Sequence, residues 1–277
     1  MTLIPKIKYL TNKDLLREIH LSKNTFCSFV DKSYHEYDAI VTDIANINSE
    51  IILAAKETRS ARLSKEAYIE ASVTDKKANV KDFVIEPESI NETELIFRVM
   101  TYDHIPLAPG RKKTLKNKAD YHEKVNFPPF QHWKYNQNNE LECVGKSHWT
   151  GDIATGHFDK HRGNMTNNLA HMFLKLCERY ATKGNVRGYT YNDEMKGQAI
   201  LQLTQIGLQF DESKSSNPFA YYTAAVTNSF VRVLNIEKRN QNIRDDILEI
   251  NGMNPSWTRQ NSSPSIAPIT TVTPETE

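Results

Sequence analysis

The residues best suited to chemistry lie between residues 217 and 244, where two adjacent tyrosines precede a series of cations. An aromatic ring can stack on an unpaired base with about 1–3 kcal/mol, and a Lys or Arg side chain can bind a backbone phosphate. This grouping is typical of a protein that binds partly opened DNA; the alternative is a core helix with buried tyrosines and solvated arginines. The tyrosines are Tyr221 and Tyr222, and the cations are Arg232, Lys238, Arg239 and Arg244.

A second group of cations occurs at residues 111–118, in the sequence RKKTLKNK. It directly follows Pro109 and Gly110, which indicate a turn, so a contact with a phosphate backbone would be sterically easy there. An exposed loop without a partner is the equally favoured alternative.

A third group contains histidines and carboxylates, which are potential zinc ligands. Gly151, Gly156 and Gly163 interrupt this stretch, and no second spaced pair of Cys or His follows, so local hydrogen bonding is favoured over a metal site. The group consists of His148, Asp152, His157, Asp159 and His161. The common phosphate-binding and hydrolase motifs are missing from the sequence. We therefore expect no catalytic residue, no metal and no cofactor.

The charge balance limits the classes of partner. The 277 residues include 35 Lys and Arg and 34 Asp and Glu, which gives a formal charge of +1. A nucleic acid must therefore be bound by a local patch, not by an overall field. Cys27, Cys143 and Cys177 are too far apart to suggest a disulfide framework, which favours a cytoplasmic protein. No apolar run has the length of a signal peptide or a membrane span, so we expect no membrane partner.

Hydrophobic spacing predicts the elements of the first half. Thr11 with Asp14 resembles a capping box and predicts a helix to about Lys23. Apolar residues at three- and four-residue steps predict a second helix over residues 37–55. The runs VKDFVI and ELIFRVMTY predict strands, and proline and glycine clusters up to residue 152 indicate loops with a further hairpin.

Three more helices are predicted in the second half. The first covers residues 165–180, the second begins near Asn192, and the third begins at Asn217 and Pro218 with a cap residue and a preset φ. On the third helix one stripe should pack in the core, and a neighbouring face with Tyr221 and Asn228 should stay available. The packing stripe consists of Phe219, Tyr222, Val226, Phe230 and Val233.

These elements predict a mainly α fold with four segments. We expect N-terminal helices in residues 1–78, a loop-rich α+β insert in residues 79–163, a helical domain in residues 164–250 and a disordered tail in residues 251–277. The tail is rich in Ser, Thr and Pro.

The helical segment resembles a known family. The run NNLAHMFLKLCERYATKGNVRGYTYNDEMKGQAILQLTQIGLQFDESKSSNPFAYYTAAVTNSFVRVLNIEKRNQ is similar to the late-transcription sigma factors of large contractile-tailed bacteriophages. These are minimal members of the sigma-70 family, reduced to its second conserved region. The N-terminal PKIKYLTNKDLLREI resembles the same family, so the similarity covers residues 3–22 and 164–242. It implies a helical region 2 bundle in the cytoplasm of an infected bacterium.

The resemblance implies roles for two helices. The helix that begins at Asp193 would dock on the clamp helices of the largest catalytic subunit of host core RNA polymerase. The helix that begins at Phe219 would recognise and open the promoter −10 element, with Tyr221 or Tyr222 stacking on a flipped base. Tyr222 aligns with the aromatic residue on which the housekeeping proteins stack the flipped adenine, whereas Tyr221 aligns with the tyrosine of the phage family. The polymerase-binding residues would be Glu194, Gly197, Gln198 and Leu201, and the DNA-binding residues Tyr221, Tyr222, Asn228, Arg232, Lys238 and Arg239.

The chain also departs from the family. Ala225 and Val226 replace the tandem tryptophans of the housekeeping proteins, and no helix-turn-helix for a −35 element follows. A short C-terminal motif of the phage proteins binds the replication sliding clamp; the tail here offers Ile266, Ile269 and Val272 for such a clamp or a coactivator. The insert, residues 24–163, has no counterpart in the family.

Three hypotheses follow. The first is a non-catalytic sigma-like subunit, the second is a polymerase-binding adaptor or inhibitor that does not read DNA, and the third is a metal-dependent enzyme built around His148, His157 and His161.

Overall fold

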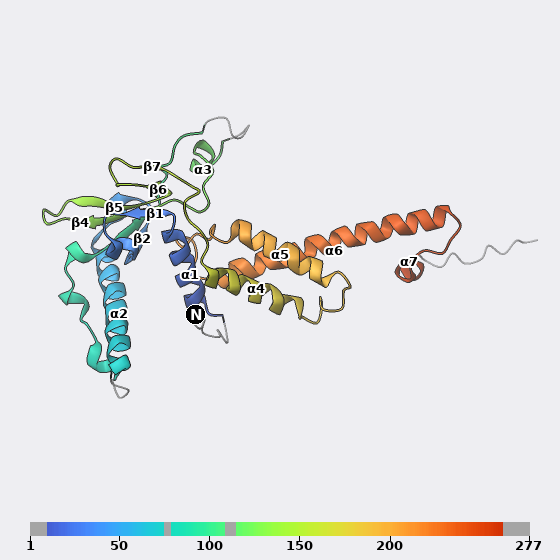
Figure 1. Cartoon of the computed structure of the whole chain (residues 1–277), viewed down its shortest axis with the longest axis horizontal. Helices are drawn as coiled ribbons and strands as arrows, with labels where there is room; N and C mark the ends of the chain where they lie inside the picture. Colours follow the sequence, from blue (N-terminus) through green and yellow to red (C-terminus); the bar gives the residue numbers. More distant parts are fainter. Residues whose placement is uncertain (1–9, 75–78, 109–114, 263–277) are drawn as a thin grey trace, which may run out of the picture.

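A group of four helices forms the larger core of the protein (Figure 1). The computed structural model describes residues 10–74, 79–108 and 115–262. The helices are α1 (Asn12–Asn24), α4 (Asn167–Ala181), α5 (Asn192–Ile206) and α6 (Pro218–Ile250). Their buried faces meet in one cluster that includes Leu15, Phe173, Leu203 and Val226.

Side-chain caps determine where three of these helices begin, as the sequence predicts. Thr11 accepts a hydrogen bond from the Asp14 amide, Thr166 from the Leu169 amide, and Asn217 from the Ala220 amide. Such caps satisfy amides that have no partner within the helix. The observed bounds of all four helices confirm their predicted positions, although α5 begins without a side-chain cap. On α6 the predicted packing stripe is buried with one exception, because Phe219 is exposed.

A five-stranded sheet forms the second part of the structure. Its strands are β1 (Cys27–Phe29), β2 (Ala39–Val41), β3 (Phe97–Val99), β4 (Gln131–Tyr135) and β5 (Leu141–Ser147), in the spatial order β1-β5-β4-β3-β2. Only β2 and β3 pair in parallel; the other neighbours are antiparallel. The parallel pair needs a crossover, which α2 (Ser49–Thr74) provides. Ala55 of α2 packs on Phe97 in a second, smaller core.

Short elements complete the fold. The strands β6 (Trp149–Thr150) and β7 (His157–Phe158) form a two-stranded sheet. The short helices are α3 (Lys118–Tyr121) and α7 (Trp257–Ser262). Single 3-10 turns are η1 (Lys32–His35), η2 (Ile44–Asn46), η3 (Val80–Phe83), η4 (Pro87–Ser89) and η5 (Glu92–Glu94).

The expected mainly α fold is wrong. The protein has 52% helix and 11% strand, with a mixed five-stranded sheet, and is therefore a mixed α/β protein. The helix predicted over residues 37–55 begins only at Ser49, and β2 lies in its place. A tertiary contact explains the difference: buried Asp38 accepts hydrogen bonds from the Ile96 amide (2.9 Å) and from Arg62 (2.7 Å), which holds this stretch beside β3.

Two further expectations need correction. Residues 80–83 of VKDFVI form the 3-10 turn η3, whereas ELIFRVMTY contributes β3 and the predicted hairpin is β4–β5. The expected disorder of residues 251–277 does not hold for residues 251–262. There Asp245 on α6 accepts hydrogen bonds from the amide and the hydroxyl of Ser256, and α7 follows. Residues 263–277, with Ile266, Ile269 and Val272, lie outside the described residues.

The sheet and the helical group share one core. The larger hydrophobic cluster includes Phe26, Phe127 and Phe130 together with the four helices. The expected boundary between residues 78 and 79 cuts through the sheet, because β1 and β2 precede it and β3, β4 and β5 follow it. Residues 24–163 are thus built into the helical group through common side-chain packing.

Candidate nucleic-acid interface

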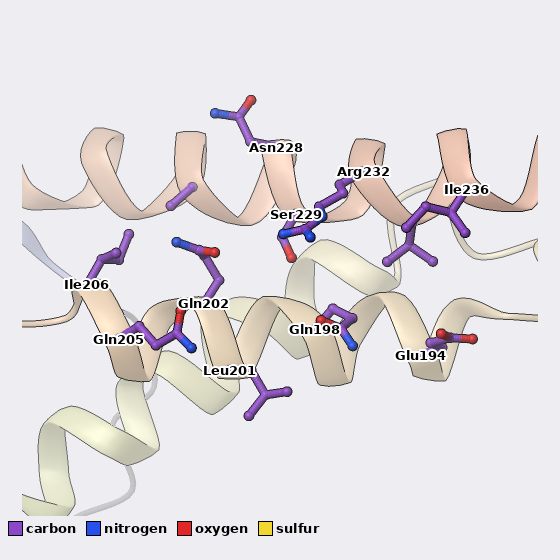
Figure 2. Close-up of a pocket in the computed structure, with 12 residues that line it drawn as sticks. Glu194, Gln198, Leu201, Gln202, Gln205, Ile206, Asn228, Ser229, Arg232 and Ile236 are labelled. Atoms are coloured by element: carbon purple, nitrogen blue, oxygen red, sulfur yellow. The ribbon is translucent and has the colours of Figure 1, made fainter. Parts of the chain in front are cut away.

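A groove runs between α5 and α6, which lie in opposite directions (Figure 2). Glu194 near the start of α5 lies across from Ile236, and Ile206 at the end of α5 lies near the first half of α6. The groove encloses about 550 Å³. Gln202 and Ile206 reach from α5 toward α6, and Ser229 and Arg232 reach toward α5 (Figure 2). The groove is therefore a mixed polar and apolar surface between the two helices singled out in the sequence.

The four predicted polymerase-binding residues share one exposed face of α5. Glu194, Gly197, Gln198 and Leu201 are all exposed, and 56% of the Leu201 surface is accessible. A Cβ atom at Gly197 would meet no atom within 4 Å, so the packing of this chain does not require glycine there. Glycine inside a helix costs about 1 kcal/mol relative to alanine. Gly197 therefore leaves space on the exposed face of α5, where the backbone of the helix is open to close approach by a partner.

Tyr222 does not belong to the open surface. Its side chain is fully buried, its hydroxyl donates a hydrogen bond to the Gly207 carbonyl at 2.5 Å, and its ring contacts Phe173 edge-on with centroids 4.8 Å apart. Burial raises the pKa of Tyr222 far above the ordinary value for a tyrosine. This ring holds α6 on α4 and on the end of α5.

Tyr221 lies on the open surface. Its accessible fraction is 37%, and its ring leans edge-on against Phe210 with centroids 5.6 Å apart. Burial of part of the ring raises the pKa of Tyr221, so the phenol is neutral near neutral pH. Of the two adjacent tyrosines, only Tyr221 therefore presents a ring to a ligand in this structure.

Helical geometry aligns Tyr221 with other predicted DNA-binding residues. Tyr221, Asn228, Arg232 and Arg239 are separated by seven, four and seven residues, which puts them on one side of α6. All four are exposed, and a surface hollow of about 600 Å³ is lined by the last three together with Val231, Asn235 and Ile236. Lys238 is also exposed but lies on a neighbouring side of the helix. The structure thus brings four of the six predicted residues into one stripe, with Lys238 beside it and Tyr222 beneath it.

A buried ionic cluster anchors the loop that leads to this stripe. Glu212, whose side chain is 3% exposed, lies 2.8 Å from Lys23 Nζ and 3.2 Å from Arg98 Nη1. Lys23 also donates a hydrogen bond to the Phe210 carbonyl at 2.7 Å. The cluster therefore fastens residues 210–212 to α1 and to β3, and Phe210 in turn contacts Tyr221.

Arg98 is enclosed by aromatic rings. Its guanidinium carbon lies 3.9 Å from the ring centroids of both Tyr37 and Phe130, and its Nε donates a hydrogen bond to His132 Nε2 at 3.0 Å. This arrangement stabilises a cation away from water. Burial alone would raise the pKa of Glu212, but the charges of Lys23 and Arg98 outweigh it and lower that pKa to about 2. The carboxylate is therefore ionised at neutral pH.

The predicted group of histidines and carboxylates is dispersed. Within residues 10–74, 79–108 and 115–262, no three His, Cys, Asp or Glu side chains are placed to hold a metal ion. His148 is buried beside Phe127 with ring centroids 4.1 Å apart, and burial lowers its pKa to about 3. His157 and His161 lie outside this apolar contact, in and after β7.

The basic run at residues 111–118 falls partly outside the described residues. Residues 111–114 are among those that the structure does not describe, whereas Lys116 is exposed just before α3 and Lys118 is exposed as its first residue. Asp120 accepts hydrogen bonds from the amides of Lys116 and Asn117 at 3.1 Å, which orders this end of the run.

Sequence reasoning missed two sets of residues. Gln202, Gln205 and Ser229 line the groove, and the helical period around Glu194 and Gln198 could have indicated the two glutamines. No sequence pattern indicated the ionic cluster, because Lys23, Arg98 and Glu212 lie far apart along the chain.

Comparisons with protein-family models, with curated proteins and with solved structures found no match to this chain. None of the helices in the described part of the chain combines the length and the apolar character needed to cross a membrane.

Proposed function

We propose that this chain is a sigma-like specificity subunit that directs host core RNA polymerase to phage late promoters in the cytoplasm of the infected bacterium. In this function it recognises and opens a −10-type element and catalyses no reaction itself. The observation that carries the proposal is the exposed stripe of Tyr221, Asn228, Arg232 and Arg239 on α6, next to an exposed polar face on α5.

The stripe has the chemistry that opened DNA requires. Tyr221 presents a neutral ring that can stack on an unpaired base, with about 1–3 kcal/mol of stabilisation. Arg232 and Arg239 lie farther along the same side of α6 and can bind successive phosphates. Stacking at Tyr221 offsets the few kcal/mol needed to take a base out of the duplex. Lys238 extends the positive surface onto the next side of the helix.

The face of α5 supplies the contact with polymerase. Glu194 and Gln198 are one helical turn apart and exposed, Leu201 adds an apolar contact, and Gly197 leaves room for close approach. With a net charge of +1 the free chain has little attraction for DNA in general. Promoter binding would thus depend on contacts that polymerase supplies.

The buried position of Tyr222 favours a second candidate, a polymerase-binding adaptor or inhibitor that does not read DNA. In the housekeeping proteins the ring that receives the flipped base aligns with Tyr222, and here that ring is enclosed by Gly207 and Phe173. The two candidates share the α5 face and differ only in whether α6 contacts DNA.

Run-off transcription separates these candidates. Bacterial core polymerase with the wild-type chain should start at a fixed site on an AT-rich late-type promoter, and the combined variant Tyr221→Ala and Arg232→Ala should lose this activity while still co-purifying with polymerase. The variant Ile69→Ser, at an exposed position on α2 outside both proposed contact faces, is the control and should start normally. Initiation that survives the combined variant would contradict DNA reading by α6, and co-purification without initiation by the wild type would favour the adaptor.

A further inference from the structure

The second half of α6 carries an apolar stripe that the described part of the chain leaves largely exposed, although Ile236 at its start also lines the groove with α5. Beyond the N-terminal end of α5 this half of the helix projects away from the body of the protein (Figure 1). Ile236, Ile243, Ile247 and Ile250 follow one another at steps of seven, four and three residues, so they lie on one side of the helix. Their accessible fractions range from 48% to 84%.

The helix α7 does not cover this stripe. It lies against another part of α6. Ser256, which directly precedes α7, forms hydrogen bonds with Gln241 and Asp245. Arg259 in α7 forms ion pairs with Asp246 and Glu249. Four isoleucines in one line on a projecting helix exceed the scattered apolar residues of an ordinary surface, and such a stripe is typical of an interaction site. Its step pattern matches the seam of a short coiled coil.

The charges that flank the stripe identify the kind of partner. If a second copy lies antiparallel, with its Ile247 against Ile236, coiled-coil geometry places Arg239 beside Asp246 of the second copy on one flank, where Asp246 also pairs with Arg259 of its own chain. On the other flank it places Glu237 beside Arg244 of the second copy. By symmetry each pair occurs twice, so all four flanking pairs are of opposite charge.

A parallel arrangement lacks this complementarity. It would put Arg239 of each copy beside Arg244 of the other, which repel each other. Asn240 falls within the seam in either arrangement and weakens the packing there, which suits a reversible association.

We propose that the occupant of this surface is a second copy of the same chain, bound antiparallel along residues 236–250 of α6. The dimer is symmetric, with the same patch on both copies, as expected for a closed pair. If the proposed function holds, the dimer also occupies Arg239, one of the residues assigned to DNA, and so limits DNA binding by the free chain.

The mass of the full-length protein in solution tests this inference without polymerase or DNA. Sedimentation equilibrium from about 1 µM to about 1 mM should show conversion from 31.8 kDa to a species of twice that mass. Ile243→Ser should raise the dissociation constant at least about tenfold, because it removes an apolar side chain from each copy. Ile69→Ser, at an exposed position on α2, should leave the dissociation constant unchanged.

Charge exchange tests the orientation. Arg244→Glu should weaken the dimer by about tenfold, because it faces Glu237 of the second copy, and the combined Glu237→Arg and Arg244→Glu variant should restore it. A single 31.8 kDa species at every concentration would overturn the proposal, as would a dimer that Ile243→Ser leaves intact. Tighter association of Arg244→Glu would indicate parallel helices. An unchanged dissociation constant would show that these pairs lie outside the interface. Either result overturns the antiparallel dimer.

Discussion

The ionic cluster around Glu212 makes a quantitative prediction about stability. Replacing Glu212 by Gln removes the negative charge but keeps nearly the same side-chain shape. Lys23 and Arg98 would then remain buried without their counter-charge, since their distances to the carboxylate are 2.8 and 3.2 Å. Breaking a buried ion pair in this way costs about 3–5 kcal/mol.

The lowered pKa of Glu212 gives a magnitude of the same order. A fall from 4.5 to about 2, at about 1.4 kcal/mol per pKa unit, corresponds to about 3 kcal/mol. Because the pKa is lower in the folded state, this contribution is fully present above about pH 4.5. It is lost as the pH falls through about 2, where the folded protein also takes up the proton.

The assay is urea unfolding of the wild type and of Glu212→Gln at a series of pH values. We expect the wild type to be more stable by about 3 kcal/mol near pH 7, and the difference to shrink between about pH 4.5 and about pH 2. Half-buried His20, whose Nδ1 lies 3.7 Å from Glu212, belongs to the same cluster and adds a further acid loss, because burial and Arg98 lower its pKa to about 3.

Glu36→Gln provides the matched control. Glu36 also pairs with an arginine, Arg62, at 2.8 Å, but its side chain is 44% exposed. An exposed pair contributes less than about 1 kcal/mol, so this variant should unfold nearly as the wild type does. Equal losses for the two variants, or a difference for Glu212→Gln that does not depend on pH, would refute the role assigned to the cluster.

Three further predictions concern single side chains and are checked by urea unfolding. Gly197→Ala should stabilise the free chain by about 0.5–1 kcal/mol, since its Cβ meets no atom within 4 Å, yet weaken co-purification with polymerase; a destabilised variant would contradict the open face. Asn217→Ala should cost about 1 kcal/mol, because the cap on the Ala220 amide is lost, and an unchanged midpoint would contradict that cap. Tyr222→Phe should lower the free energy of unfolding by about 1–2 kcal/mol, because the hydrogen bond to the Gly207 carbonyl is lost, but it should retain transcription. Loss of transcription in a folded Tyr222→Phe protein would contradict the assignment of base stacking to Tyr221.

The helical part of the fold could be predicted because its signals are local. Caps at Thr11 and Asn217 and the apolar steps on α4, α5 and α6 are contained in short stretches of sequence. Even the burial of Tyr222 follows from its place four residues before Val226 on the packing stripe. The sequence alone left both tyrosines open as stacking rings, and the structure exposes only Tyr221.

The sheet could not be predicted in the same way. Its strands β1, β2 and β3 have three residues each, too few for an alternating pattern, and β2 pairs with β3 across the whole of α2. Asp38, which holds β2 in place, has partners at Arg62 and Ile96 that no local pattern connects. The mixed α/β class is a consequence of such distant contacts.

Opening of the promoter strand is the most direct test of the account. A fluorescent base analogue at the flipped position of the −10-type element should brighten when polymerase and the wild-type chain are both present. Tyr221→Ala should abolish this signal, and Tyr222→Phe should retain it. A signal of full size with Tyr221→Ala, or one that polymerase produces without the chain, would contradict the claim that α6 opens DNA through Tyr221.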